Sequence, residues 1–329
     1  YGSALHQRAG SASAMLPLLD RILTLLPSQT RRSEEMQARQ QFSTPVAYGL
    51  AAVTAAAITP ADRVLEPSAG TGLLAILAEI SGGMLMLNEL ADLRAGLLDV
   101  LFPSVRVSRF DAAQIHDHLA ADLVPSVIVM NPPFSAMANV QAHMADTALR
   151  HVSSALARLA PGGRLVTITG SNFSPEQPNW RDAFIQLQEA ARVVFSAAVD
   201  GAVYAKHSTT FDTRLTVIDK IAADDPACFP QSAGLAPDVR TLMGWIADRL
   251  PARPHVELPA APVAVPARTV LIPAAKRSVR PARKTGDVST TDPAAERLAY
   301  DRLDWQPDEA ARLTDAIYEE YELQTIAIP

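Results

Sequence analysis

An apolar segment that ends in Asn-Pro-Pro-Phe is the feature of this chain with the clearest chemical meaning. Residues 127–130 are typical of a buried strand, and Asn131, Pro132, Pro133 and Phe134 follow directly. Because proline fixes φ and lacks an N–H group, this turn cannot extend a strand ladder, and its carbonyl groups stay available as acceptors. The Asn131 side-chain oxygen and the Pro132 carbonyl could therefore accept two hydrogen bonds from one planar amino group. Such acceptors would aim the nitrogen lone pair at an electrophile.

A glycine-rich turn upstream indicates which ligand could supply the electrophile. Residues 63–66 read as a short strand, the turn runs from Glu66 to Gly72, and a helix is predicted over 73–80. Gly70 and Gly72 permit positive φ and close approach of the backbone to a ligand. The turn lacks the third glycine of a dinucleotide fingerprint and the Gly-Lys-Ser/Thr of a phosphate-binding loop. Glu66 at the strand end would repel phosphate and suits a cationic amino group, as in S-adenosylmethionine.

Two further carboxylates follow the next two predicted strands. Glu89 comes just after strand 84–87, where a Rossmann-type fold places an acid on the ribose hydroxyls. Asp111 follows strand 105–107 and could accept from an adenine amino group, while Phe110 would cover the ring. Three acids that end three successive strands favour a ligand-binding edge over solvated strand ends.

The remaining periodicity predicts an α/β fold with a mainly parallel sheet. Apolar runs that alternate with helical spacing predict helices at 46–57, 140–160 and 182–191 and strands at 164–168, 193–195 and 214–218. This order places the strand-ending acids and Asn131 at one sheet edge.

Residues 40–221 resemble an N6-adenine DNA methyltransferase of the class I S-adenosylmethionine-dependent type, with motifs in the order known as gamma. The resemblance rests on the Asn-Pro-Pro-Phe turn, on the glycine turn and on the segment 41–45 before it. It implies a Rossmann-like, seven-stranded sheet with a closing antiparallel hairpin. It also implies that the target adenine flips out of DNA and stacks on Phe134, with Tyr204, or failing that Phe211, on the opposite face.

The resemblance also implies a cofactor pocket that begins before the glycine turn. Thr44 is predicted as N-cap and Pro45 as first residue of helix 46–57, and in the family this element packs beside the methionine end of the cofactor. Asn131, Pro132, Pro133 and Phe134 are the predicted catalytic residues. The predicted cofactor-binding set is Phe42, Thr44, Pro45, Glu66, Pro67, Ser68, Ala69, Gly70, Gly72, Glu89, Leu90, Asp111, Ala112 and Asn131.

Composition limits the other possibilities. The 329 residues are 48% hydrophobic, enough for one large core with appendages. The single Cys228 excludes a disulfide framework and favours a reducing, cytoplasmic location. No apolar run suggests a membrane span, and no metal site is expected. A net charge of −6 disfavours binding to a polyanion, so sequence specificity is expected to be weak or to be supplied by the missing part or by a partner.

We expect four regions along the chain. Residues 1–39 form an N-terminal helical segment, 40–221 the methyltransferase domain, 222–292 a Pro/Ala-rich linker with a basic cluster, and 293–329 a helical segment that leads to a missing C-terminal part. This layout resembles the amino-terminal methylase region of bacterial strawberry-notch-type helicase proteins. It implies DNA as partner and a C-terminal helicase region of the same protein.

Two alternatives stay open from the sequence. Asn-Pro-Pro-aromatic turns also serve methyltransferases that act on an amino group of an RNA base or on a protein glutamine. The chain could also be a catalytically silent module that binds DNA or cofactor within a larger machine. The Thr-Pro element favours DNA adenine over the first, and the intact Glu66, Gly70 and Asn131 disfavour the second.

Overall fold

The computed structural model describes residues 2–8, 10–25, 43–133, 147–207 and 210–256. All of these ranges fall within one compact unit that spans residues 1–260. Phe42, Phe134 and every residue after 256 lie outside the described residues, so the predictions made for them stay predictions.

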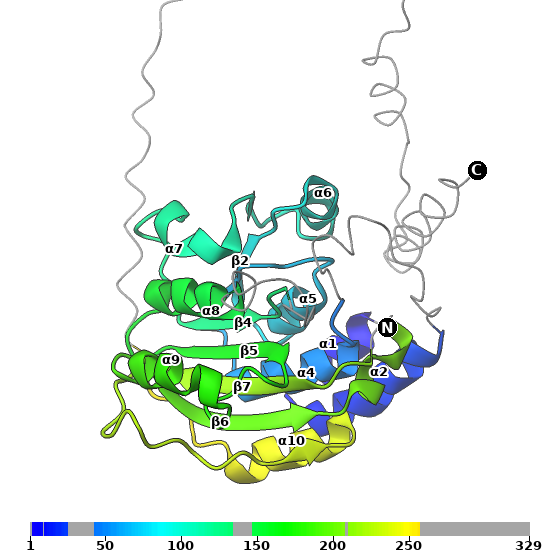
Figure 1. Cartoon of the computed structure of the whole chain (residues 1–329). Coiled ribbons are helices and arrows are strands. Elements are labelled where there is room, and N and C mark those ends of the chain that lie inside the picture. Colours follow the sequence, from blue (N-terminus) through cyan, green and yellow to red (C-terminus); the bar gives the residue numbers. More distant parts are fainter. Residues whose placement is uncertain (1, 9, 26–42, 134–146, 208–209, 257–329) are drawn as a thin grey trace, which may run out of the picture. The chain divides into compact units, whose positions relative to one another are not determined.

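Eight strands form one sheet in the order β3-β2-β1-β4-β5-β7-β6-β8 (Figure 1). Their bounds are β1 Arg63–Glu66, β2 Met84–Asn88, β3 Val107–Ser108, β4 Val127–Met130, β5 Arg164–Gly170, β6 Arg192–Val199, β7 Thr213–Asp219 and β8 Leu235–Ala236. Only β7 runs against its neighbours, being antiparallel to both β5 and β6. The predicted mainly parallel, Rossmann-like sheet with an antiparallel closing strand is confirmed, and β8 adds one short strand to it.

Helices cover both faces of this sheet (Figure 1). One layer contains α1 Gly2–His6, α2 Ala12–Leu25, α4 Val46–Ala56, α5 Leu73–Ile80 and α10 Val239–Arg249; the other contains α7 Ile115–His118, α8 Thr147–Arg158 and α9 Pro178–Gln188. The helix α6 Asp92–Leu101 packs near the β2–β3 edge, and the 3₁₀ segments are η1 Ala112–Gln114 and η2 Gly201–His207. Alternate strand residues face the two layers: Val64 packs with α4 and Leu65 with α8.

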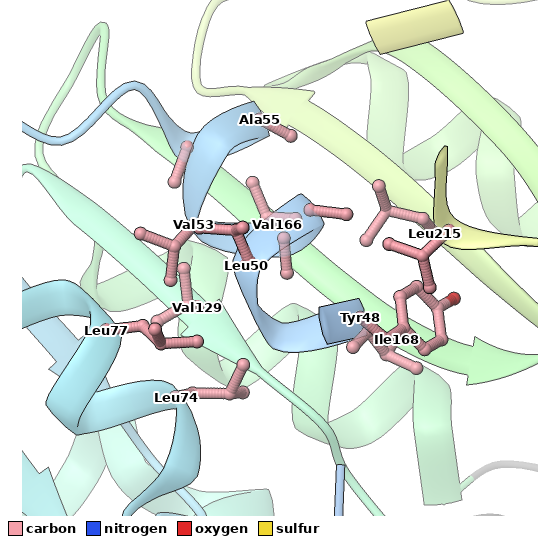
Figure 2. Close-up of a cluster of buried hydrophobic side chains, with 14 of the residues drawn as sticks. Tyr48, Leu50, Val53, Ala55, Leu74, Leu77, Val129, Val166, Ile168 and Leu215 are labelled. Carbon is pink, nitrogen blue, oxygen red and sulfur yellow. The ribbon is translucent and has the colours of Figure 1, made fainter. Parts of the chain in front are cut away.

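Helix α4 is the centre of the larger core. Ten of its eleven residues are buried, as expected of a helix that is apolar all round. It contacts α2, α5 and α10 and lies over β4, β5 and β7. Figure 2 shows its side chains Leu50 and Val53 among Leu74 and Leu77 of α5 and the strand residue Val129. The position of α4 therefore fixes where the residues at its amino end lie.

The compact unit continues past residue 221, where the methyltransferase domain was expected to end. Residues of α10, including Leu242 and Ile246, are buried in the core that surrounds α4, because the helix is apolar on one face. Beyond it, Arg253 donates two hydrogen bonds to the Asp62 carboxylate at 2.9 and 2.8 Å. The compact unit therefore includes part of the region that was predicted to be a linker.

Candidate active site

A pocket of about 260 Å³ opens at the carboxyl edge of the parallel strands. Its walls come from the segments that follow β1, β2, β3 and β4 and from the residues just before α4, because parallel strands bring their carboxyl ends to one edge. The predicted site residues that line it are Thr44, Glu66, Pro67, Ser68, Ala69, Gly70, Glu89, Leu90, Asp111, Ala112, Asn131, Pro132 and Pro133. These residues, predicted from separate motifs, lie in one cavity.

The backbone conformation of Gly70 and a hydrogen bond to Glu89 fix the shape of the glycine turn. Gly70 has φ +56°, a conformation that favours glycine, and its N–H donates to Glu89 Oε2 at 2.8 Å. The other carboxylate oxygen of Glu89 accepts from the Ala91 N–H at 2.9 Å, where α6 begins. Glu89 therefore braces the turn and still lines the pocket.

Asn88, which the sequence analysis did not select, ties the loops around the pocket together. It is fully buried at the end of β2, and its amide nitrogen donates to the carbonyls of Pro67 (2.8 Å) and Phe110 (2.9 Å). Its side-chain oxygen accepts from Ser108 Oγ and from the Phe110 N–H, both at 2.9 Å. All four hydrogen-bonding positions of the amide are used, so Asn88 fixes the glycine turn relative to the loop that carries Phe110.

Glu66 presents a buried, unsatisfied carboxyl oxygen to the pocket. Only 2% of the residue is exposed, and Oε2 has no hydrogen-bond partner among the described residues. Burial raises the pKa of the Glu66 carboxyl well above its usual 4.5, the Glu89 carboxylate raises it further, and a hydrogen bond from the Ala75 backbone opposes both. A cationic group brought to this oxygen would favour the ionised form.

This raised pKa predicts a pH-dependent loss of stability in the ligand-free protein. Below pH 4.5 the Glu66 carboxyl is neutral in both the folded and the unfolded chain. At higher pH this carboxyl ionises in the unfolded chain, whereas the folded site disfavours its ionisation. The stability contributed by Glu66 is therefore lost as the pH rises through its folded pKa. Glu66→Gln mimics the neutral form. The free energy of unfolding of this variant, measured by urea titration, should therefore increase relative to that of the wild type as the pH rises from 4.5 to 8. Glu79→Gln, at an exposed site on α5, is the matched control. A constant difference across this pH range would contradict the account.

The other end of the pocket has an aromatic face and two polar groups. Phe110 stacks on His118 with ring centroids 5.0 Å apart, and Phe110, Asp111 and His151 line the pocket. Asp111 is the N-cap of η1, and its Oδ1 accepts a hydrogen bond from the Ala113 N–H. His151 of α8 is 7% exposed, and its Nδ1 has no partner among the described residues. Burial lowers the pKa of the His151 imidazole, Asp111 opposes this and Arg150 lowers the pKa further, so the site favours the neutral ring.

Asn131 lies where β4 enters the pocket, beside the start of α4. Its Nδ2 donates to Thr44 Oγ1 at 2.8 Å. Thr44 is buried and does not cap α4; Pro45 occupies the N-cap position with φ −56° and ψ 131°, so the N-cap lies one residue later in the chain than predicted. The predicted N-cap role of Thr44 is thus wrong, because its hydroxyl serves Asn131 and the helix begins at Val46.

Several predicted site residues do not line the pocket formed by the described residues. Pro45 is the N-cap of α4, and Gly72, at φ +82°, packs against α6, where an added Cβ would meet Phe102 at 2.9 Å. Tyr204 is fully buried and edge-on to Tyr48, with ring centroids 5.8 Å apart, and the runner-up Phe211 is 59% exposed. Neither is among the described residues that line the pocket, so their role in stacking on a base stays a prediction. Phe42 and Phe134 lie outside the described residues.

Other pocket residues were not predicted: Ser43, Thr71, Leu73, Leu74, Arg94 and His151. Most of them neighbour a predicted motif in sequence, so proximity could have suggested them. His151 is different, because it comes from the middle of α8 and only the pairing of that helix with the sheet brings it to the cavity. A histidine among small apolar residues of a predicted helix was the only available signal.

The residues present fit S-adenosylmethionine. Glu66 offers a buried acceptor to an ammonium group, Gly70 leaves out a side chain at the cavity wall, and Asp111, His151 and Phe110 suit an adenine ring with an exocyclic amine. Within the described ranges no cluster of His, Cys, Asp and Glu could hold a metal ion. None of the helices in those ranges combines the length and apolar character that crossing a bilayer requires.

Comparison with known proteins supports the fold. No protein-family model and no curated protein gives a significant match to the sequence. The modification subunit of a putative type I restriction enzyme from Vibrio vulnificus YJ016 is similar with a TM-score of 0.50 and 15% identity, over 74% of this chain and 60% of that one. A putative class I S-adenosylmethionine-dependent methyltransferase from Listeria monocytogenes has a TM-score of 0.50 and 12% identity, over 75% and 79%.

A third similar structure is the type I restriction enzyme EcoKI M protein, with a TM-score of 0.46 and 16% identity over 56% of this chain and 45% of that one. The chain thus matches less than two thirds of the length of either restriction-enzyme subunit. At these identities the similarity concerns the fold: the chain has the Rossmann-like fold of class I methyltransferases.

Proposed function

We propose that this protein transfers a methyl group from S-adenosylmethionine to the N6 amino group of adenine in DNA. The observation that carries the proposal is the position of Asn131, which lines the same pocket as Glu66, the glycine turn and Asp111. A hydrogen-bond acceptor for an amine and a site for an adenosine-containing cation therefore share one cavity.

The residues divide the task between binding and alignment. Glu66 holds the ammonium end of the cofactor, Glu89 the ribose, and Asp111 with Phe110 the adenine. When bound, the sulfonium would supply its methyl group to the amine nitrogen, whose lone pair forms the N–C bond as the C–S bond breaks. The cofactor would leave as a neutral thioether, and one proton would pass from the nitrogen to solvent. Asn131 Oδ1 and the Pro132 carbonyl accept hydrogen bonds from the amine and align its lone pair with the methyl group.

DNA adenine is proposed as the substrate for two reasons. The Thr-Pro element before the glycine turn resembles that of gamma-type adenine methyltransferases, and Thr44 of that element lines the pocket. The similar structure from Vibrio vulnificus is named as a modification subunit of a type I restriction enzyme. Phe134 stays the predicted stacking residue, and the association with a helicase region stays a prediction.

Cofactor binding can be tested at Gly70. An arginine there would be strained at φ +56° and would enter the cavity beside Arg94. At 100 times its Kd, a ligand adds about 2.7 kcal/mol of stability, or roughly 5–10 °C in Tm. We expect such a rise with S-adenosylmethionine for the wild type and none for Gly70→Arg. Gly244→Arg is the matched control, because Gly244 is exposed on α10 with nothing within 4 Å, and should keep the rise. No rise in the wild type at millimolar cofactor would favour a silent module.

The substrate class can be tested by competition. DNA, RNA and protein are offered together with S-adenosylmethionine that carries a labelled methyl group, and the label in each fraction is counted. The proposal requires label in DNA. Label only in RNA or only in protein would move the function to that substrate and leave the chemistry of Asn131 unchanged.

A further inference from the structure

Arg94 is the one arginine or lysine among the described residues that line the pocket. The carboxyl groups of Glu66, Glu89 and Asp111 belong to the same lining. The other titratable side chain there is His151, whose surroundings favour the neutral ring. The described part of the lining therefore holds three carboxyl groups and one permanent cation.

The guanidinium of Arg94 lies beside the glycine turn. Arg94 belongs to the first turn of α6, and its side chain is half-buried. A Cβ added at Gly70 would lie 3.5 Å from Arg94 Nη1, so the missing side chain of Gly70 leaves the guanidinium next to the backbone of the turn. A positive charge in the first turn of a helix opposes the helix dipole. The helix itself therefore disfavours an arginine at this position, whereas the pocket beside it can use one.

Three N–H groups of the glycine turn are already engaged within the protein. The Ala69 N–H donates to the carbonyl at the end of β2 at 2.9 Å, and the Gly72 N–H donates to the Ala69 carbonyl at 2.8 Å. The Gly70 N–H donates to the Glu89 carboxylate. Loops of this kind bind anions when successive N–H groups are free to point at the ligand. An anionic group at this turn therefore depends on side chains, and Arg94 supplies the positive charge.

The proposed cofactor brings one anionic group to this pocket. The methionine end of S-adenosylmethionine carries an ammonium and a carboxylate on the same carbon atom, so the two charges enter together. In the proposed function Glu66 holds the ammonium, and a carboxyl group cannot also attract the carboxylate. We propose that Arg94 binds this carboxylate and makes the pocket selective for ligands with an intact amino-acid end. The inference rests on the proposed function, because it takes the same cofactor as the ligand.

The chemistry of arginine suits this task. A planar guanidinium can donate two parallel hydrogen bonds to the two oxygens of a carboxylate, and such charge-assisted pairs are stronger than neutral ones. In a half-buried position the pair corresponds to about 10- to 100-fold in affinity. Ser68 and Thr71 also line the pocket and can donate hydrogen bonds. Their hydroxyl groups are neutral, so they cannot balance the charge of the ligand.

Two ligands that differ by one group test the proposal. Decarboxylated S-adenosylmethionine keeps the adenosine, the sulfonium and the amine and lacks only the carboxylate. In calorimetric titrations of the wild type, we expect its Kd to be about 10- to 100-fold higher than that of S-adenosylmethionine. In Arg94→Gln this preference should fall below about threefold. The whole change should come from weaker binding of S-adenosylmethionine.

A control variant and a third ligand separate the carboxylate from general electrostatics. Arg106→Gln removes the same charge at an exposed position outside the described lining of the pocket, and it should keep the wild-type preference. S-adenosylhomocysteine keeps the carboxylate and lacks the sulfonium charge, so it should lose as much affinity as S-adenosylmethionine in Arg94→Gln. Arg94→Lys keeps the charge without the planar pair of donors, and it should recover part of the loss.

Two other outcomes would overturn the proposal. Equal losses for S-adenosylmethionine and its decarboxylated form in Arg94→Gln would show that Arg94 supports the shape of the glycine turn. Unchanged affinities for both ligands, together with weaker and less salt-dependent binding of DNA, would assign Arg94 to a phosphate group of the nucleic acid.

These titrations need no methyl transfer, so the inference and the proposed function can fail separately. A protein that prefers S-adenosylmethionine through Arg94 and methylates nothing would overturn only the proposed function. A protein that methylates adenine and binds the two ligands with equal affinity would overturn only the inference.

Discussion

Asn131→Ala is expected to reduce methyl transfer by roughly 10³-fold or to background, while the Kd for S-adenosylmethionine stays within a few-fold. The alanine cannot accept from the amine, and loss of one preorganised hydrogen-bonding group in an active site costs on the order of 10²- to 10³-fold in rate. The hydrogen bond from Asn131 to Thr44 is lost as well. Binding is affected less, because Glu66, Asp111 and the glycine turn remain. Single-turnover rates and calorimetric titration measure the two quantities separately.

The matched control is Asn172→Ala, the same substitution at an exposed position outside the pocket. It should transfer methyl groups at the wild-type rate. If Asn131→Ala instead lost cofactor binding and kept its rate at saturating cofactor, the assignment of Asn131 to the amine would be wrong. Asn131 would then act on the cofactor.

Asp219→Ala is expected to lower the free energy of unfolding by about 3–5 kcal/mol, the usual cost of leaving one partner of a buried ion pair unpaired. The carboxylate of Asp219 on β7 binds Arg164 of β5 through both oxygens, at 2.7 and 3.0 Å. Both side chains are at most 2% exposed. The same guanidinium donates to the carbonyls of Ala55 and Pro251 at 3.2 Å, so it joins the end of α4 to the strand pair. Urea titration at neutral pH measures the loss.

Two comparisons show whether burial is the cause. Asp92→Ala removes a partner of Arg109 in an exposed pair with side chains 45% and 90% exposed, and should cost at most about 1 kcal/mol. The double variant Arg164→Met with Asp219→Leu replaces both charges by apolar groups and should recover most of the stability. A loss below about 1 kcal/mol in Asp219→Ala would contradict the role of burial and show that water solvates the unpaired Arg164 guanidinium.

The backbone around the site could be predicted because its local signals are strong. The strands 63–66 and 127–130 and the helix 73–80 have the predicted bounds, since each is largely apolar and is followed by a turn that contains glycine or proline. The short edge strand β3 was placed two residues too early, because Val105 bonds back to Phe102 in a turn. Edge strands with one neighbour carry a weaker pattern.

The side-chain contacts could not be predicted, because they join residues far apart in the chain. Thr44 has the sequence context of an N-cap, and only the packing of α4 over β4 gives its hydroxyl to Asn131. Tyr204 has the context of a stacking aromatic in a hairpin, but tertiary packing buries it in the core that contains α4, edge-on to Tyr48. Asn88 is a single polar residue at the end of an apolar strand, which does not reveal its four hydrogen bonds.

The segment after residue 221 shows the limit of composition as a guide. Its prolines predict a linker, but Val239, Leu242 and Ile246 recur at three- and four-residue spacing and bury one face of α10 beside α4. Residues 242–250 read as a short amphipathic helix from the sequence alone, but the sequence does not show that this helix joins the core beside α4. Tertiary packing decides such cases.

The central claim is tested most directly by the identity of the methylated product. The protein is incubated with unmethylated DNA and S-adenosylmethionine that carries a deuterated methyl group, the DNA is digested to nucleosides, and the products are identified by mass spectrometry. The account predicts labelled N6-methyl-2′-deoxyadenosine from the wild type and none from Asn131→Ala. Label on another nucleoside, or equal label from both proteins, would contradict it.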